Sequence, residues 1–124
     1  MRLNPDCIRG ILLAVEEKEL GSTYNVDTLH AKIPEFSVEE ITYCCLKLDE
    51  AGLLQIMTIR ALRQTHPAIK SIHELTMKGH DFLDNIRSES VWKETKSKAT
   101  SVGSFALDVI SQIASSIITA RLGF

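Results

Sequence analysis

The sequence predicts a mainly α-helical protein with one small β-hairpin and a long apolar helix at its C-terminus. Hydrophobic residues recur at helical spacing in several segments, and capping residues, prolines or glycines bound these segments. One stretch, residues 53–75, is instead rich in β-branched and aliphatic residues on both sides of a turn. The 124 residues are 44% hydrophobic and 24% charged, which suits a compact core and excludes a large multi-domain enzyme, a fibrous repeat and a wholly disordered chain.

The first predicted helix spans about residues 5–18. Asn4 can cap it, Pro5 suits its first position, and Asp6 complements the helix dipole. The side chains at helical spacing that should face the core are Ile8, Ile11, Leu12 and Val15.

Two short elements and a third helix follow. Residues 22–26 suggest an edge strand, and Asp27 can cap a two-turn helix that Pro34 ends. Ser37 and Glu40 form a capping box that opens a helix over about residues 38–51, with Gly52 placed to end it. Its predicted buried face comprises Val38, Ile41, Cys45 and Leu48.

Residues 53–62 and 68–75 predict two strands joined by a turn at 64–67. A short helix, a turn, a second helix and then a hairpin is the order of a winged helix-turn-helix. Thr76 can cap the next helix, and residues 88–90 should break the chain before Trp92. We therefore expect a winged-helix domain over residues 1–88 and a C-terminal helical assembly segment over residues 89–124.

The segment from residue 104 to residue 122 is apolar around most of a helix. At roughly 1.5–3 kcal/mol for each buried large side chain, its burial represents on the order of 10–20 kcal/mol, more than a small domain can accommodate. We therefore predict that this helix packs against copies of itself or a partner, so that the protein is a homo-oligomer. The candidate interface residues are Phe105, Leu107, Val109, Ile110, Ile113, Ile117, Ile118 and Leu122.

The chain resembles a phage and prophage family, domain-of-unknown-function family 2513, found chiefly in Gram-positive bacteria and their phages. The resemblance rests on LNPDC (3–7), LKLDEAGL (46–53), LT (75–76), GHDFLDNIR (79–87), VWK (91–93) and GSFALD (103–108), and it covers almost the whole chain. It implies a phage or prophage accessory protein with a winged-helix-like core. It transfers no catalytic residue, because the family has no established activity.

The two halves of the chain carry opposite net charge, and this distribution indicates which parts of the protein could bind DNA. Residues 1–50 hold five basic and ten acidic side chains, and residues 51–124 hold nine basic and six acidic ones. The exposed face of the third helix should present Glu39, Glu40, Tyr43, Lys47 and Glu50, a poor surface for a polyanion. Residues 60–73 of the hairpin include no acidic residue and could follow a DNA backbone through Arg60, Arg63, His66, Lys70 and His73, although a solvated basic hairpin is the simpler interpretation.

No catalytic, cofactor or metal signature emerges. Cys44 and Cys45 point about 100° apart on a helix, which suits buried thiols better than a zinc site or a disulfide. His80, Asp84 and Arg87 share one helix face as a surface group, with no strained nucleophile turn nearby.

We expect a cytoplasmic protein in a reducing compartment, because the N-terminal residues lack the basic region and apolar run of a secretory signal, and the three cysteines are too few and odd in number for a disulfide framework. Integral membrane insertion is not expected, because Asp108 and Arg121 interrupt the terminal helix. Contact with a membrane surface through Lys93, Lys96 and Lys98 stays an alternative. The favoured function is a non-enzymatic module that binds another protein and self-associates, and the alternative is a DNA-binding regulator that uses the hairpin.

Overall fold

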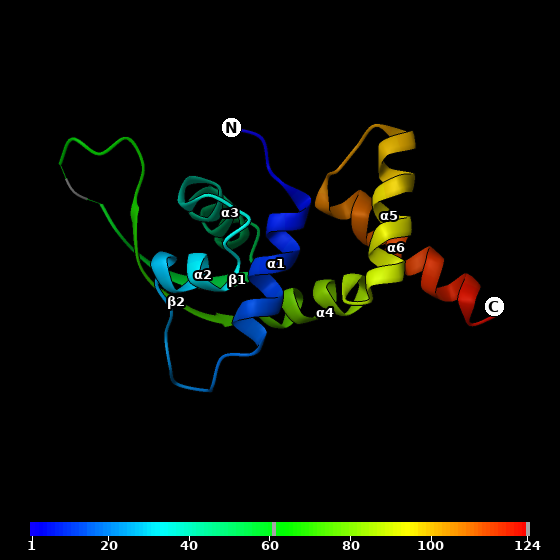
Figure 1. Ribbon diagram of the computed structural model, residues 1–124, viewed down its shortest axis with the longest axis horizontal. Helices are drawn as coiled ribbons and strands as arrows, with labels where there is room; N and C mark the ends of the chain where they lie inside the picture. The colour runs from blue at the N-terminus through cyan, green and yellow to red at the C-terminus, as the bar shows by residue number, and fades with distance from the viewer. Residues whose placement is uncertain (61, 124) are drawn as a thin grey trace. The chain divides into compact units, whose positions relative to one another are not determined.

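The computed structural model describes residues 1–60 and 62–123, which form six helices and one two-stranded antiparallel sheet (Figure 1). The mainly α fold with a small hairpin is therefore confirmed. In chain order the elements are α1 (Pro5–Glu16), α2 (Val26–Lys32), α3 (Val38–Glu50), β1 (Leu54–Ile59), β2 (Ala68–Leu75), α4 (Met77–Ile86), α5 (Glu89–Val102) and α6 (Leu107–Arg121).

The described residues form two compact units, Met1–His80 and Asp81–Phe124. The division falls inside α4, whereas the boundary expected from the sequence follows residue 88, just after that helix.

Helices α1 and α2 both begin at an asparagine. The Asn4 side chain accepts hydrogen bonds from the backbone amides of Asp6 (3.0 Å) and Cys7 (3.4 Å), as predicted. Asn25, and not Asp27, caps α2, because its Oδ1 accepts from the Thr28 amide at 2.8 Å while Asp27 lies in the first turn.

The predicted strand at 22–26 is reduced to one isolated β-bridge. Tyr24 and Ile72 exchange two backbone hydrogen bonds of 3.0 and 2.7 Å, so the loop after α1 is tied to β2 without forming a strand. Helix α1 also ends earlier than the predicted residue 18, because the side chain of Lys18 turns into this loop and donates to the backbone oxygens of Glu19 and Ser22.

Helix α3 begins with the predicted capping box between Ser37 and Glu40. It packs against α1, α2 and β1, which explains why Cys44 is buried along with the predicted core residues Ile41, Cys45 and Leu48. Val38 was predicted to be buried, but it is 37% exposed, because it lies in the first turn of α3, where it lines an open groove.

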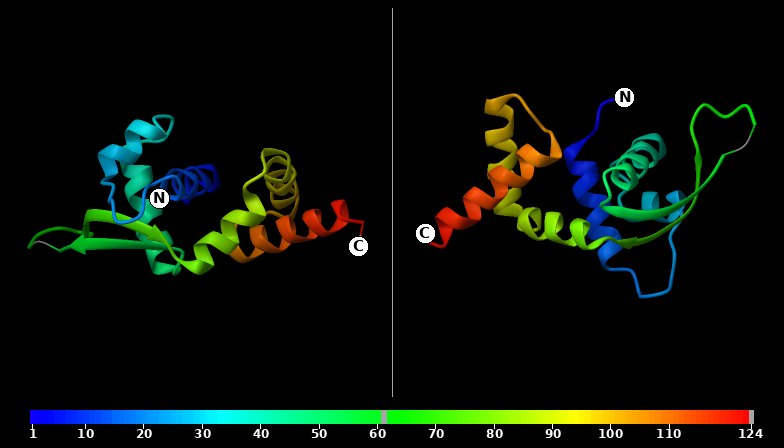
Figure 2. Two further views of the ribbon diagram at one scale, coloured as in Figure 1. Left: turned by 90° about the horizontal axis from the view of Figure 1, so that it is seen from below. Right: turned by 180° about the vertical axis from the view of Figure 1, so that it is seen from behind.

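The hairpin extends beyond the helices of its unit as a long arm (Figures 1 and 2). Strands β1 and β2 pair in an antiparallel register, from Leu54 opposite Leu75 to Ile59 opposite Ala68, with irregularities on either side of Ile56 and Met57. The base of the hairpin is buried, whereas most of the β1 side chains beyond it are exposed.

In the second unit α5 packs against α6. Ser88 caps α5, because its Oγ accepts a hydrogen bond from the Val91 amide, and a new helix therefore begins at the predicted break. Gly103 ends the helix with a φ of 84°. The buried side chains along these two helices include Trp92, Thr95, Ala99, Ile110, Ala114 and Ile117. Among the described residues, no helix combines the length and apolarity needed to cross a lipid bilayer.

Candidate functional site

A groove in the first unit runs between the outward side of α3 and the hairpin, with a volume of about 980 Å³. We call it the α3–hairpin groove. Its α3 side is formed by Val38, Glu39, Thr42, Tyr43, Leu46, Lys47, Asp49 and Glu50. The hairpin side is formed by Thr58, Arg60, Thr65, His66 and Pro67, and Met1 also lines the groove.

The α3 side of the groove is acidic. Glu39 and Asp49 are exposed, and Lys47, the one cation that α3 contributes, is engaged by Glu50 at 3.0 Å. This hydrogen bond holds the pKa of Lys47 above its ordinary value, so the lysine stays charged and paired. The carboxylates therefore set the net charge on this side of the groove.

Glu40, one of the three carboxylates of the predicted helix face, is used within the fold. Asn4 Nδ2 donates to Glu40 Oε2 at 3.0 Å, and Glu40 Oε1 accepts from the Ser37 amide in the capping box. Glu40 is consequently half-buried and joins the start of α1 to the start of α3.

The hairpin side is basic, but the structure does not gather all five predicted hairpin residues. Arg60 and His66 line the groove, whereas Arg63 and Lys70 are exposed and are not part of its lining. His73 is half-buried, and its Nε2 forms a 2.7 Å hydrogen bond with Ser71 Oγ.

The α3 side of the groove also carries an apolar strip, which the sequence did not predict as surface. Val38, Thr42 and Leu46 follow one another at a spacing of four along α3. Val38 fits the helical spacing of the core residues, and it was therefore predicted to be buried. Leu46 is apolar but lies outside the predicted core face, and this mismatch was the one sign in the sequence of an apolar surface on this helix.

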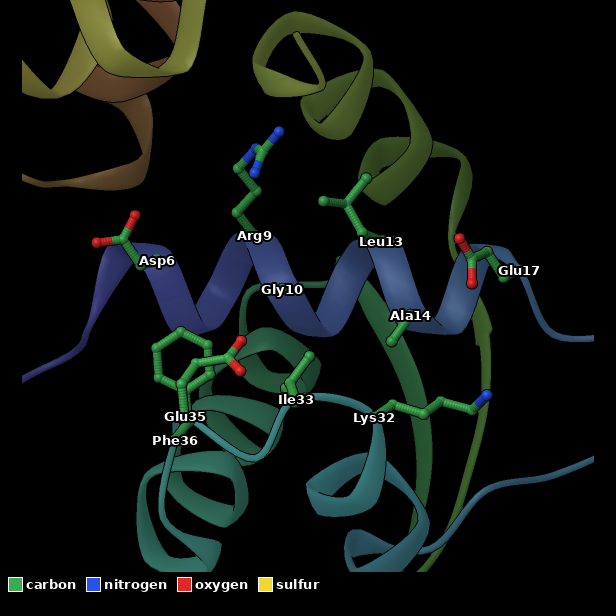
Figure 3. Close-up of a pocket in the computed structure, with 10 residues that line it drawn as sticks. All are labelled: Asp6, Arg9, Gly10, Leu13, Ala14, Glu17, Lys32, Ile33, Glu35 and Phe36. Atoms are coloured by element: carbon green, nitrogen blue, oxygen red, sulfur yellow. The ribbon is translucent and has the colours of Figure 1, made fainter. Parts of the chain in front are cut away.

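A second, smaller groove of about 520 Å³ lies along α1 (Figure 3). Arg9 and Leu13 project from α1 on one side of it, and Ile33 and Phe36 approach from the segment after α2. No residue predicted as a binding residue lines this groove.

The cysteines lie in the core of the first unit. Burial raises the pKa of Cys45 to about 12. A hydrogen bond between Cys7 and Cys44 raises the pKa of Cys7 and lowers that of Cys44. Within residues 1–60 and 62–123, no group of three or more His, Cys, Asp or Glu side chains is arranged to hold a metal ion.

Polar side chains in α4 and just after it lie close to carboxylates. Arg87 contacts Asp84 at 2.8 Å, and His80 lies 3.9 Å from Glu16. His80 therefore has its carboxylate neighbour on α1 and not at the predicted position Asp84, because α4 begins beside the end of α1.

The candidate interface residues of α6 differ in burial. Ile110 and Ile117 are buried, and Leu107, Val109, Ile113 and Ile118 are half-buried. Phe105 and Leu122 are 44% and 65% exposed. Part of the apolar surface predicted for this helix is thus open to a partner.

The family model described as "Hypothetical protein (DUF2513)" matches residues 2–105. A Haemophilus influenzae protein described as an "Uncharacterized protein" is 32% identical over 123 residues, which cover 98% of this chain and 99% of the relative. No solved structure matches the chain significantly.

Proposed function

This chain belongs to the DUF2513 family of hypothetical proteins, as its sequence motifs indicated, and we propose that it is a non-enzymatic winged-helix module that binds another protein through the α3–hairpin groove. We further propose that it self-associates through α6 and serves as a phage or prophage accessory protein in the host cytoplasm. The observation that carries the proposal is the acidic α3 side of the groove.

The order of elements supports the winged-helix interpretation. Helix α2 is followed by α3 and then by the β1–β2 hairpin, and the Tyr24–Ile72 bridge occupies the place of a third, minimal strand. In a DNA-reading member of this fold class, α3 would enter the major groove. Here that helix would bring Glu39, Asp49 and Glu50 towards phosphates, which opposes binding to DNA.

The apolar strip supports a protein as the partner. Protein interfaces combine apolar contacts with a polar rim, and Val38 and Leu46 line the groove together with charged residues of α3 and of the hairpin. A groove of this size also accommodates side chains of a partner without unfolding any element of the unit.

Photo-crosslinking tests this proposal. A photoreactive amino acid replaces Thr42 in the groove of the full-length protein, and a matched control replaces Ser97, which is exposed on α5. In nuclease-treated lysate of its native cells, we expect position 42 to cross-link to a protein and position 97 to give no such product. Absence of a protein adduct at position 42 would overturn the proposal.

DNA binding through the hairpin is the second candidate function, and the exposure of Arg60, Arg63, His66 and Lys70 favours it. A dimer suited to this role would place two hairpins on one face about 34–36 Å apart, one turn of DNA. An electrophoretic mobility shift on random duplex DNA at low salt tests it, and the variants Arg60→Ala and Arg63→Ala should bind the DNA more weakly. No shift at micromolar protein removes this candidate.

A further inference from the structure

We infer that the partner segment in the α3–hairpin groove is a cationic amphipathic helix, whose apolar ridge lies on α3 and whose lysine or arginine side chains face Glu39 and Asp49. The inference rests on the proposed function and names the chemistry of the partner at that same groove.

The shape of the apolar strip favours a helix. Val38, Thr42 and Leu46 form one i, i+4, i+8 ridge, inclined to the axis of α3, and a helix packed at an angle offers a matching ridge at positions i, i+4 and i+7. A helix docked along this ridge meets Val38, Thr42 and Leu46 over about two turns of α3. A single extended strand would place alternate side chains away from the strip.

The charged residues of α3 determine the sign of the charge that the partner carries. Glu39 and Asp49 lie towards opposite ends of the strip, about 15 Å apart along the helix axis at 1.5 Å per residue. Lys47 does not neutralise them, because Glu50 holds its ammonium group at 3.0 Å. A partner with two cations about ten residues apart on a helix would meet both carboxylates.

The basic residues on the hairpin side favour a partner helix that carries cations along one flank only. Arg60 and His66 approach the groove opposite α3, so a second cationic flank on the partner would face like charge there. DNA fits this groove poorly for a related reason, since its phosphates would lie against Glu39 and Asp49 whichever way it entered.

The test uses two fluorescent helical peptides of about 18 residues with the same leucine and alanine ridge. One carries lysines about ten residues apart beside the ridge, and the other carries glutamates at the same places. Binding to the full-length protein is followed by fluorescence anisotropy at low salt. We expect the lysine peptide to bind and the glutamate peptide to bind at least about tenfold more weakly.

Charge reversal then locates the binding. The double variant Glu39→Lys with Asp49→Lys should bind the lysine peptide at least about tenfold more weakly, because attraction is lost at two rim positions and repulsion replaces it. Glu17→Lys with Glu19→Lys is the matched control, since it changes net charge equally at two exposed residues outside this groove, and it should leave the affinity within about twofold. Equal losses in both variants, or tighter binding of the glutamate peptide, overturn the inference.

Circular dichroism checks that each variant is folded. If the reversal at Glu39 disturbs the first turn of α3, Glu39→Gln with Asp49→Asn replaces it, with an expected loss of about threefold. A cross-link from position 42 to a protein segment without lysine or arginine overturns this inference and leaves the proposed function standing. Displacement of the lysine peptide by duplex DNA, with no protein cross-link at position 42, overturns both.

Discussion

Lys18 Nζ lies 2.6 Å from Glu74 Oε1, and the lysine side chain is fully buried while that of Glu74 is 38% exposed. The same ammonium group donates to the backbone oxygens of Ser22 at 2.6 Å and Glu19 at 3.1 Å. One side chain thus joins the loop after α1 to strand β2, next to the Tyr24–Ile72 bridge. The hairpin that forms one side of the groove is fixed to the helices partly through this contact.

Replacing Lys18 by methionine should lower the free energy of unfolding by about 1–3 kcal/mol, because two backbone oxygens and a carboxylate lose a charged donor. Urea denaturation of the full-length protein measures the change. Lys93→Met, at an exposed position on α5, is the control and should stay within about 0.5 kcal/mol of the wild type. A Lys18 variant as stable as the control would show that the contact does not hold the loop.

The same contact predicts an acid-dependent loss of stability. The hydrogen bond from Lys18 holds the pKa of Glu74 below its ordinary value of 4.5. The carboxylate is therefore stabilising above that value, and its contribution disappears as the pH falls through the lowered pKa in the folded protein. Urea midpoints measured from about pH 7 to about pH 3 should fall more steeply for the wild type than for Glu74→Gln. Parallel curves would contradict the assignment.

Gly79 should tolerate no side chain. A Cβ atom at this position would overlap the backbone carbonyl oxygen of Leu53, a group that already accepts the Thr76 amide at 3.1 Å. Because the clash is with backbone, Gly79→Ala should destabilise the protein by about 2–4 kcal/mol despite the better helix propensity of alanine. Met77→Ala, at an exposed position of the same helix, is the comparison, and thermal unfolding that ranks the two variants equally would refute the prediction.

The three thiols should react slowly in the folded protein. Cys7, Cys44 and Cys45 are all buried, and burial keeps Cys45 protonated because its pKa is about 12. A thiol reagent at about pH 8 should therefore label the native protein only at the rate at which it opens, and label all three at once in about 6 M guanidinium. Fast labelling of the native protein would show that this part of the core is open.

Local signals predicted much of the fold. The capping box at Ser37, the caps at Asn4 and Thr76, and the break before α5 each depend on neighbouring residues, and the structure confirms each. Asp27 was wrong as a cap because Asn25, two residues earlier, offers an equally suitable side chain, and propensity alone does not rank them.

Features that depend on tertiary contacts were harder to predict. Val38 fits the periodicity of the core face but lines an open groove at the first turn of α3. The expected strand at 22–26 is one bridge, beside a loop that the buried Lys18 side chain contacts. The groove itself joins residues from α3 with residues of the hairpin. The sequence predicted Glu39 and Glu50 on the exposed side of α3 and five basic hairpin residues, but neither the part of Asp49 nor which hairpin residues would face α3.

Self-association through α6 is the last prediction. Ile110 and Ile117 are buried, yet Phe105 and Leu122 remain exposed at the two ends of this segment. Contiguous exposed apolar surface marks an interface, and the half-buried Leu107, Val109, Ile113 and Ile118 add to the apolar surface between these two ends. We expect light scattering to show the full-length wild type as a dimer or larger, and Phe105→Asp with Leu122→Asp as a monomer, because each carboxylate would have to be desolvated in the interface.

The control for this variant is Met77→Asp with Leu20→Asp, which places the same two charges at residues that are also largely exposed but lie in the first unit. It should keep the wild-type mass, since neither residue belongs to α6. Both double variants are first checked for native circular dichroism. Equal masses for the wild type and the α6 variant would remove α6 as the assembly surface. The partner-binding proposal for the groove would be unaffected, because it depends on α3 and the hairpin alone.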